Sequence, residues 1–150
     1  MDKNIIDEAS KKAINLYRGG THCSLAILYS INDLLGNPLA EEKINLVSRL
    51  PVGIGYGGCF CGAVSGGVMA IGFIIGKKSS NDYRVKAACE ELHRWFKHTC
   101  NASCCNGLNK HMKCRSKEYD EKWANLTGEL AGKTMELILK YKVTGGSIDK

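Results

Sequence analysis

Residues 50 to 76 form the longest stretch of this chain without a charged side chain. On length alone, such a stretch could cross a membrane. Nine of its residues are glycines, however, and its first dozen residues are typical of a loop. Only residues 62 to 75 are left to form a helix, which is short for a bilayer and suits a core helix packed on all sides. We therefore expect a buried central helix and no membrane span.

The rest of the chain repeats its apolar residues at helical spacing, and no segment alternates as a strand does. The expected helices cover residues 4–18, 22–35, 38–49, 62–75 and 81–98, with a long last helix opening at Ser116. This pattern predicts one all-α domain over residues 1–150. We expect a compact bundle of about five helices, in which a glycine-rich loop and a cysteine-rich basic loop converge on one site.

Local signals indicate where these helices begin and how closely they pack. Thr21 is the expected N-cap of the second helix, and Asn37 and Pro38 are the expected cap and first position of the third. Small residues on the central helix should let neighbouring helices approach closely. These residues are Gly62, Gly66, Gly67 and Ala70.

The eight cysteines favour metal binding or redox chemistry over disulfides. The first twelve residues contain acids and lysines with no apolar run behind them, so no secretory signal is visible and a cytoplasmic location is expected. Disulfides rarely persist in that reducing compartment. Cysteines there more often bind metals or take part in redox reactions.

The net charge of +6 is concentrated near four of the cysteines. No acid occurs between Glu91 and Glu118. That interval contains the cations Arg94, Lys97, Lys110, Lys113, Arg115 and Lys117 together with Cys100, Cys104, Cys105 and Cys114. Cations favour thiolates and offset the negative charge of a thiolate-ligated cofactor, although a solvated basic loop is an equally good interpretation. No recognition motif or aromatic platform accompanies the charge, so nucleic-acid binding is not expected.

Cys61 follows a glycine-rich loop and lies where the central helix should begin. The unsatisfied N–H groups and the dipole of a helix N-terminus favour an anion, so the pKa of the Cys61 thiol should be lowered. Glycine lets backbone N–H groups approach a sulfur. Cys23 lies at a second helix start, whereas Cys89 falls on an apolar helical stripe and is expected to pack in the core.

The segment Cys61-Gly62-Ala63-Val64-Ser65-Gly66 resembles the CGAxxG motif of the C-GCAxxG-C-C family, a group of redox-active bacterial proteins named for four cysteines. His22-Cys23-Ser24-Leu25-Ala26 is similar to the family's early cysteine at a helix start. Cys105, before Asn106-Gly107-Leu108, resembles the third cysteine, and Cys114 resembles the fourth. The resemblance covers most of the chain.

This resemblance implies a four-thiolate site made of Cys23, Cys61, Cys105 and Cys114. Related domains in split-Soret cytochromes are associated with an iron-sulfur cluster, so the implied cofactor is such a cluster. A 2Fe-2S cluster is favoured, and 4Fe-4S or a larger cluster is left open. The cysteine spacing matches neither common ferredoxin run, so it does not choose between them. The additional cysteines Cys59, Cys100 and Cys104 leave the third ligand ambiguous and could serve a larger or second cluster.

The expected function is electron transfer or redox sensing with a redox partner protein, and an electron carrier is favoured over an enzyme that turns over a substrate. One alternative is a thiol-disulfide oxidoreductase, in which Cys59 or Cys61 attacks a disulfide and a neighbouring thiol resolves it. A structural zinc module with four thiolates is another. A homodimer is also left open, because glycine-lined helix faces and a partly exposed cluster favour association.

Overall fold

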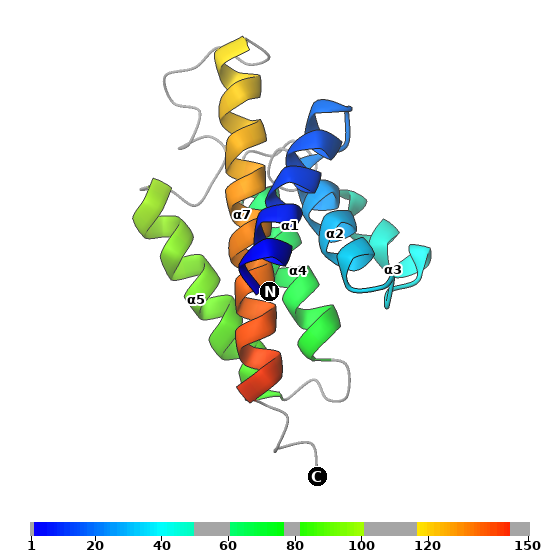
Figure 1. The fold of residues 1–150 in the computed structure, drawn as a ribbon, viewed down its shortest axis with the longest axis vertical. Coiled ribbons are helices and arrows are strands. Elements are labelled where there is room, and N and C mark those ends of the chain that lie inside the picture. Colours follow the sequence, from blue (N-terminus) through cyan, green and yellow to red (C-terminus); the bar gives the residue numbers. More distant parts are fainter. Residues whose placement is uncertain (1, 50–60, 77–81, 101–116, 145–150) are drawn as a thin grey trace.

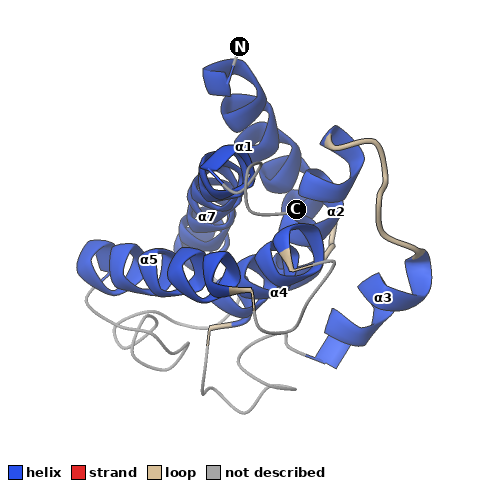
Figure 2. Ribbon diagram, turned by 90° about the horizontal axis from the view of Figure 1, so that it is seen from below, coloured by secondary structure: helices blue, strands red, loops and turns tan. Residues whose placement is uncertain are grey.

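A computed structural model describes residues 2–49, 61–76, 82–100 and 117–144 of the 150-residue chain. Its helices are α1 (Asp2–Arg18), α2 (Cys23–Leu34), α3 (Glu41–Asn45), α4 (Gly62–Ile75), α5 (Tyr83–Cys100) and α7 (Lys117–Thr144), and the short 3-10 helix η1 (Leu46–Arg49) follows α3. These ranges contain helices, turns and loops but no strand (Figure 2). The all-α prediction is confirmed.

The long helix α7 runs through the bundle, and α1, α4 and α5 lie along it (Figure 1). Helices α2, α4 and α7 run in one direction, whereas α1 and α5 run in the opposite direction. The most extensive contacts join α1 to α7, followed by α2 to α4. The starts of α2 and α4 and the end of α5 therefore point toward the same end of the bundle.

Two predicted helix starts are wrong. His22, not Thr21, is the N-cap of α2, and no side chain caps this helix. The third helix begins only at Glu41, because the turn before it is held in another conformation. The Asn32 side chain accepts a hydrogen bond from the Leu39 backbone N–H at 2.9 Å, and Asn37 has a left-handed φ of 57°. This contact between α2 and the turn replaces the expected cap at Asn37.

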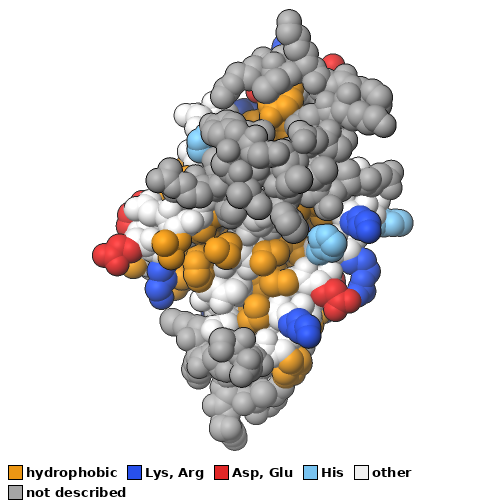
Figure 3. All heavy atoms as spheres, turned by 180° about the vertical axis from the view of Figure 1, so that it is seen from behind, with side chains coloured by type: hydrophobic (Ala, Val, Ile, Leu, Met, Phe, Trp, Pro, Cys, Tyr) orange, Lys and Arg blue, Asp and Glu red, His pale blue; other side chains and the backbone are white. Residues whose placement is uncertain are grey.

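The core is formed by apolar side chains from all the described helices, with further apolar residues half-buried around it. Its largest fully buried members are Phe96, Ile27, Leu28, Ile31, Ile44, Ile71, Leu92, Leu130, Met135, Leu137, Ile138 and Val47. Helix α4 is the most apolar helix described, yet one flank of it is only half-buried by the described residues. Hydrophobic side chains gather on that side of the molecule in Figure 3, between margins that carry charged side chains. The expectation that this helix is packed on all sides is therefore met only in part.

The predicted close approach at the glycines of α4 is confirmed at two positions. A Cβ atom added to Gly66 would lie 2.7 Å from both the Cα and the carbonyl oxygen of Ser24 in α2. At Gly67 it would lie 2.7 Å from the Thr134 hydroxyl of α7 and 2.8 Å from Leu92 of α5. Adjacent glycines thus let α4 pack against three helices.

Within the described ranges, no helix is long and apolar enough to span a bilayer.

A second glycine contact, between α1 and α7, has no counterpart in the sequence analysis. Gly128 and Gly132 are one turn apart on α7, and an added Cβ would lie 2.6 Å from Ile14 and 2.9 Å from the Ser10 hydroxyl, respectively. The Ser10 hydroxyl donates a hydrogen bond to the Gly128 carbonyl oxygen at 2.5 Å. The first helix is thereby held against the last.

An ion pair between the buried Arg84 and the half-buried Asp82 lies at the start of α5, and it predicts a pH effect on stability. The Arg84 guanidinium makes a bidentate hydrogen bond with the Asp82 carboxylate, which holds the pKa of Asp82 below its ordinary value. A lowered folded-state pKa adds stability above the unfolded pKa of about 3.9, and that stability is lost as the pH falls through the folded value. We expect Asp82→Asn to be less stable than the wild type at pH 7, with the difference closing below about pH 4. Urea titrations of both proteins between pH 7 and pH 2 would test this, and a constant difference would contradict it.

Candidate functional site

Cys23 and Cys61 each lie at the start of a helix, as the sequence predicted. Cys23 is the first residue of α2 and is 8% exposed. Cys61 is the N-cap of α4 and is 1% exposed. The Ser65 N–H and hydroxyl both donate to the Cys61 carbonyl oxygen, at 3.0 and 3.1 Å. The backbone around Cys61 is therefore fixed by the first turn of its own helix.

The contact between Ser24 and Gly66 brings these two helix starts into one region. Cys23 immediately precedes Ser24, whose backbone touches α4 at Gly66. With a rise of 1.5 Å per residue, Cys61 lies roughly 7.5 Å from Gly66 along α4. Both cysteines belong to the same cluster of buried apolar residues. Two sulfur atoms thus lie at the same end of the interface between α2 and α4.

Two opposing effects act on these cysteines: the helix starts favour a thiolate, whereas burial in the apolar core disfavours the charged form. At a helix N-terminus the backbone N–H groups of the first turn have no partner within the helix, and the helix dipole is positive there. Neither α2 nor α4 has an acidic residue in its first turn whose negative charge would offset this positive potential. The lowered pKa expected for Cys61 stays a prediction.

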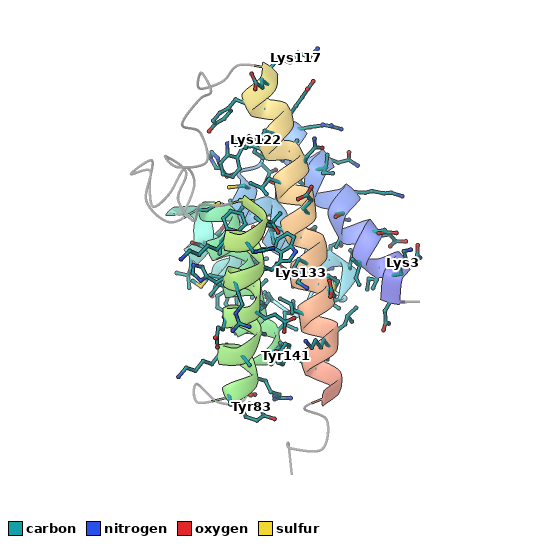
Figure 4. All side chains as sticks on the ribbon, turned by 90° about the vertical axis from the view of Figure 1, so that its left-hand side faces the viewer. Lys3, Tyr83, Lys117, Lys122, Lys133 and Tyr141 are labelled. Carbon is teal, nitrogen blue, oxygen red and sulfur yellow. The ribbon has the colours of Figure 1, made fainter. Side chains whose placement is uncertain are left out.

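Cys100 lies at the opposite kind of helix end. It is the last residue of α5 and is half-buried. Burial raises the pKa of its thiol, and Glu129 raises it further, whereas Lys122 lowers it. Both of these charged residues belong to α7, on the upper part of which Figure 4 labels Lys122. The end of α5 therefore faces this stretch of α7, and burial favours the neutral form of the Cys100 thiol.

Cys89 lies elsewhere and agrees with the predicted packing role. It is half-buried against the core between α4 and α5, with its sulfur 4.0 Å from the Val68 carbonyl oxygen. Burial raises the pKa of its thiol. An apolar setting of this kind keeps a thiol inert.

The structure describes only two of the four cysteines in the predicted ligand set. Cys105 and Cys114, and the additional Cys59 and Cys104, lie outside the described residues. Within the described ranges, no three histidine, cysteine or acidic side chains form a group that could hold a metal ion. The ligand set remains a prediction at those positions.

Two buried hydroxyls near this end of the bundle were missed by the sequence analysis. The side-chain oxygens of Ser24 and Thr127 are fully buried and have no hydrogen-bond partner among the residues described. A buried hydroxyl next to Cys23 with no acceptor among the described residues and two soft sulfur donors within the apolar core both suit a thiolate-ligated group. The residues present therefore fit an iron-sulfur cluster. No sequence pattern signals these hydroxyls, because a serine or threonine in a helix usually satisfies itself.

Comparison with known proteins gives one match. A family model described as "Putative redox-active protein (C_GCAxxG_C_C)" matches residues 21–137. This range includes Cys23, Cys61, Cys105 and Cys114. No curated protein matches the chain, and no solved structure does either.

Proposed function

Because the chain belongs to the C_GCAxxG_C_C family of redox-active proteins, we propose that it binds an iron-sulfur cluster and exchanges single electrons with a redox partner protein. Cys23 and Cys61 would supply two thiolate ligands. Cys105 and Cys114 would supply the other two, and a 2Fe-2S cluster is the favoured form. The cluster would supply one-electron chemistry that no amino-acid side chain in this chain offers at moderate potential.

The observation that carries this proposal is the burial of two cysteines at adjoining helix starts. Cys61 is 1% exposed and Cys23 is 8% exposed, and their helices touch backbone to backbone at Gly66 and Ser24. Burial excludes water from the sulfurs, and the two helix N-termini favour negative charge at this point. Both effects suit a pair of thiolates that remain bound to iron.

The surrounding charges would tune the reduction potential. Adding an electron makes a thiolate-ligated cluster more negative, so nearby positive charge raises its potential. The last turn of α5 carries Lys97 and ends at Cys100. The starts of α2 and α4 contribute positive dipole ends. Desolvation by the apolar core opposes these effects, because it disfavours the more highly charged reduced form.

The same burial argues against a thiol-disulfide oxidoreductase. The nucleophilic sulfur of such an enzyme must reach the sulfur of an incoming disulfide. Cys61 is almost completely covered, and Cys23 is nearly so. A cluster ligand needs no such access. Burial therefore favours a bound cofactor over an attacking thiol at these two residues.

Metal and sulfide analysis of the protein purified without oxygen tests the proposal directly. We expect a brown protein that contains iron and acid-labile sulfide in equal amounts, as both 2Fe-2S and 4Fe-4S clusters do. Zinc without sulfide would identify a structural zinc module instead. A colourless, metal-free protein that reduces insulin disulfides would identify an oxidoreductase. Either result would overturn the proposal.

Removal of the cluster should lower the thermal stability. Ligands drawn from separate segments tie those segments together only in the folded state, so binding adds to the free energy of unfolding. A ligand present at about a thousand times its Kd adds about 4 kcal/mol, which corresponds to a Tm decrease of about 10 °C on removal. Circular dichroism melting of loaded and chelator-stripped protein, both under nitrogen, would measure this. Coincident melting curves would contradict the prediction that a bound cluster stabilises the fold.

A further inference from the structure

The hydroxyls of Ser24 and Thr127 differ from the other buried hydroxyls of the same helices. In α2, Ser30 donates to the Ile27 carbonyl oxygen at 2.9 Å. In α7, Thr134 donates to the Leu130 carbonyl oxygen at 2.6 Å. Ser24 and Thr127 are equally buried, yet within the described ranges their hydroxyls meet no acceptor. A buried polar group normally has a partner, so each of these two calls for one.

Thr127 lies level with the start of α4. It precedes Thr134 by seven residues, so the two share one face of α7 and are about 10 Å apart along the helix. The Thr134 hydroxyl lies against Gly67, and α4 runs in the same direction as α7 (Figure 1). Cys61, the N-cap of α4, lies six residues before Gly67 and thus about 9 Å from it along the same direction. The face of α7 that carries Thr127 therefore passes the Cys61 end of α4.

Cys100 gives independent support for this placement. The charge of Glu129 raises the pKa of its thiol and the charge of Lys122 lowers it. These two residues lie on either side of Thr127 in the sequence of α7. The part of α7 that carries Thr127 therefore lies at the end of the bundle where α5 ends.

Ser24 lies on the other side of the same region. Its backbone is in contact with α4 at Gly66, and it follows Cys23 directly in the first turn of α2. Cβ atoms in a helix are tilted toward its N-terminus, so the Ser24 side chain is directed back toward the start of α2. Both unpartnered hydroxyls thus belong to the end of the bundle that holds Cys23 and Cys61.

We propose that Ser24 and Thr127 donate O–H hydrogen bonds to the thiolate sulfurs of Cys23 and Cys61 when these cysteines hold a metal group. The proposal rests on the proposed function, because the acceptors are the sulfurs of that site. Hydrogen bonds to charged acceptors are stronger than those between neutral groups. They stabilise the more negative, reduced form of a cluster and so raise its potential. Without the bound group, the described part of the chain offers neither buried hydroxyl an acceptor, which costs stability.

Four substitutions separate this role from ordinary packing. Thr127→Val and Ser24→Ala remove the unpartnered hydroxyls, whereas Thr134→Val and Ser30→Ala remove satisfied ones from the same helices. In the metal-free protein we expect Thr127→Val to raise the Tm by about 2–4 °C, because valine has the same shape and needs no acceptor. Thr134→Val should lower the Tm. A lowered Tm for Thr127→Val in metal-free protein would overturn the proposal.

Cobalt(II) titration measures the same hydroxyls in the loaded site. The sulfur-to-cobalt charge-transfer absorbance reports binding, and we expect about tenfold weaker cobalt binding in Thr127→Val and in Ser24→Ala. Thr127→Ser, which keeps the hydroxyl, should retain the wild-type affinity, as should Thr134→Val and Ser30→Ala. Unchanged affinity in both Thr127→Val and Ser24→Ala would overturn the proposal.

The reduction potential of the loaded protein completes the test and separates the two proposals. In protein that carries iron and sulfide, Thr127→Val and Ser24→Ala should shift the potential to more negative values than those of their matched controls. Wild-type protein that binds cobalt through sulfur but never takes up iron and sulfide would overturn the proposed cluster function, and the melting and cobalt results would still decide the hydroxyls. A loaded wild-type protein whose potential is the same in both hydroxyl variants would overturn only the role of the hydroxyls.

Discussion

Replacing Cys61 with serine is expected to remove almost all bound iron and sulfide from the protein. A serine hydroxyl stays protonated at neutral pH and is a poor ligand for iron, which prefers the soft thiolate sulfur in such sites. Serine is also among the best N-cap residues, and Cys61 occupies the N-cap of α4. The substitution therefore removes the sulfur while preserving the start of the helix.

The measurement is iron and acid-labile sulfide per chain after anaerobic purification, with circular dichroism to confirm the helical content. Cys89→Ser is the matched control, because this cysteine packs between α4 and α5, away from the two helix starts. We expect Cys89→Ser to retain its iron and sulfide and to lose only a little stability. If Cys89→Ser lost the cluster and Cys61→Ser kept it, the assignment of the two cysteines would be reversed.

Gly66→Ala is expected to destabilise the fold by about 2–3 kcal/mol. The added methyl group would lie 2.7 Å from the Cα and the carbonyl oxygen of Ser24. Backbone atoms cannot rotate away as a side chain can, so α2 and α4 would have to separate. Urea unfolding of the metal-free variant and wild type would measure the loss.

Gly72→Ala is the matched control on the same helix. An added Cβ at Gly72 meets nothing within 4 Å, so only helix propensity changes. Alanine is favoured over glycine in a helix interior by about 0.5–1 kcal/mol, and this variant should therefore be slightly more stable than wild type. Equal effects at the two glycines would contradict a role for close packing at Gly66.

The same substitution should also weaken the proposed site. Gly66 is the last residue of the Cys61-Gly62-Ala63-Val64-Ser65-Gly66 motif. Its contact with Ser24 fixes how closely the start of α2, with Cys23, approaches the start of α4. The motif thus combines a proposed ligand at its first residue with a helix contact at its last. Folded Gly66→Ala protein should contain less iron per chain than folded Gly72→Ala protein.

Features that depend on neighbouring residues could be predicted from the sequence. The uncharged stretch and its glycines indicated a central helix over residues 62–75, and α4 spans Gly62–Ile75. The positions of Cys23 and Cys61 at helix starts were predicted as well. Helix formation and helix ends are decided within one or two turns of the chain, so local patterns contain this information.

Features that depend on a distant partner could not be predicted. The third helix starts late because Asn32 bonds the turn at Leu39. Gly128 matters because α1 lies against it, with Ser10 donating to its carbonyl from 118 positions away in the sequence. Thr127 resembles Thr134 in sequence, yet only one of the two has an acceptor in the described structure.

By itself, the sequence determined that this protein is a helical bundle with cysteines at helix starts, because spacing and glycine placement act over a few residues. The tertiary structure decided which helix starts meet, since the close approach at Gly66 requires that no side chain stand where the backbone of Ser24 passes. It also decided which buried hydroxyls meet no acceptor among the residues that the structure describes. Both depend on contacts between helices far apart in the chain, which local patterns do not contain.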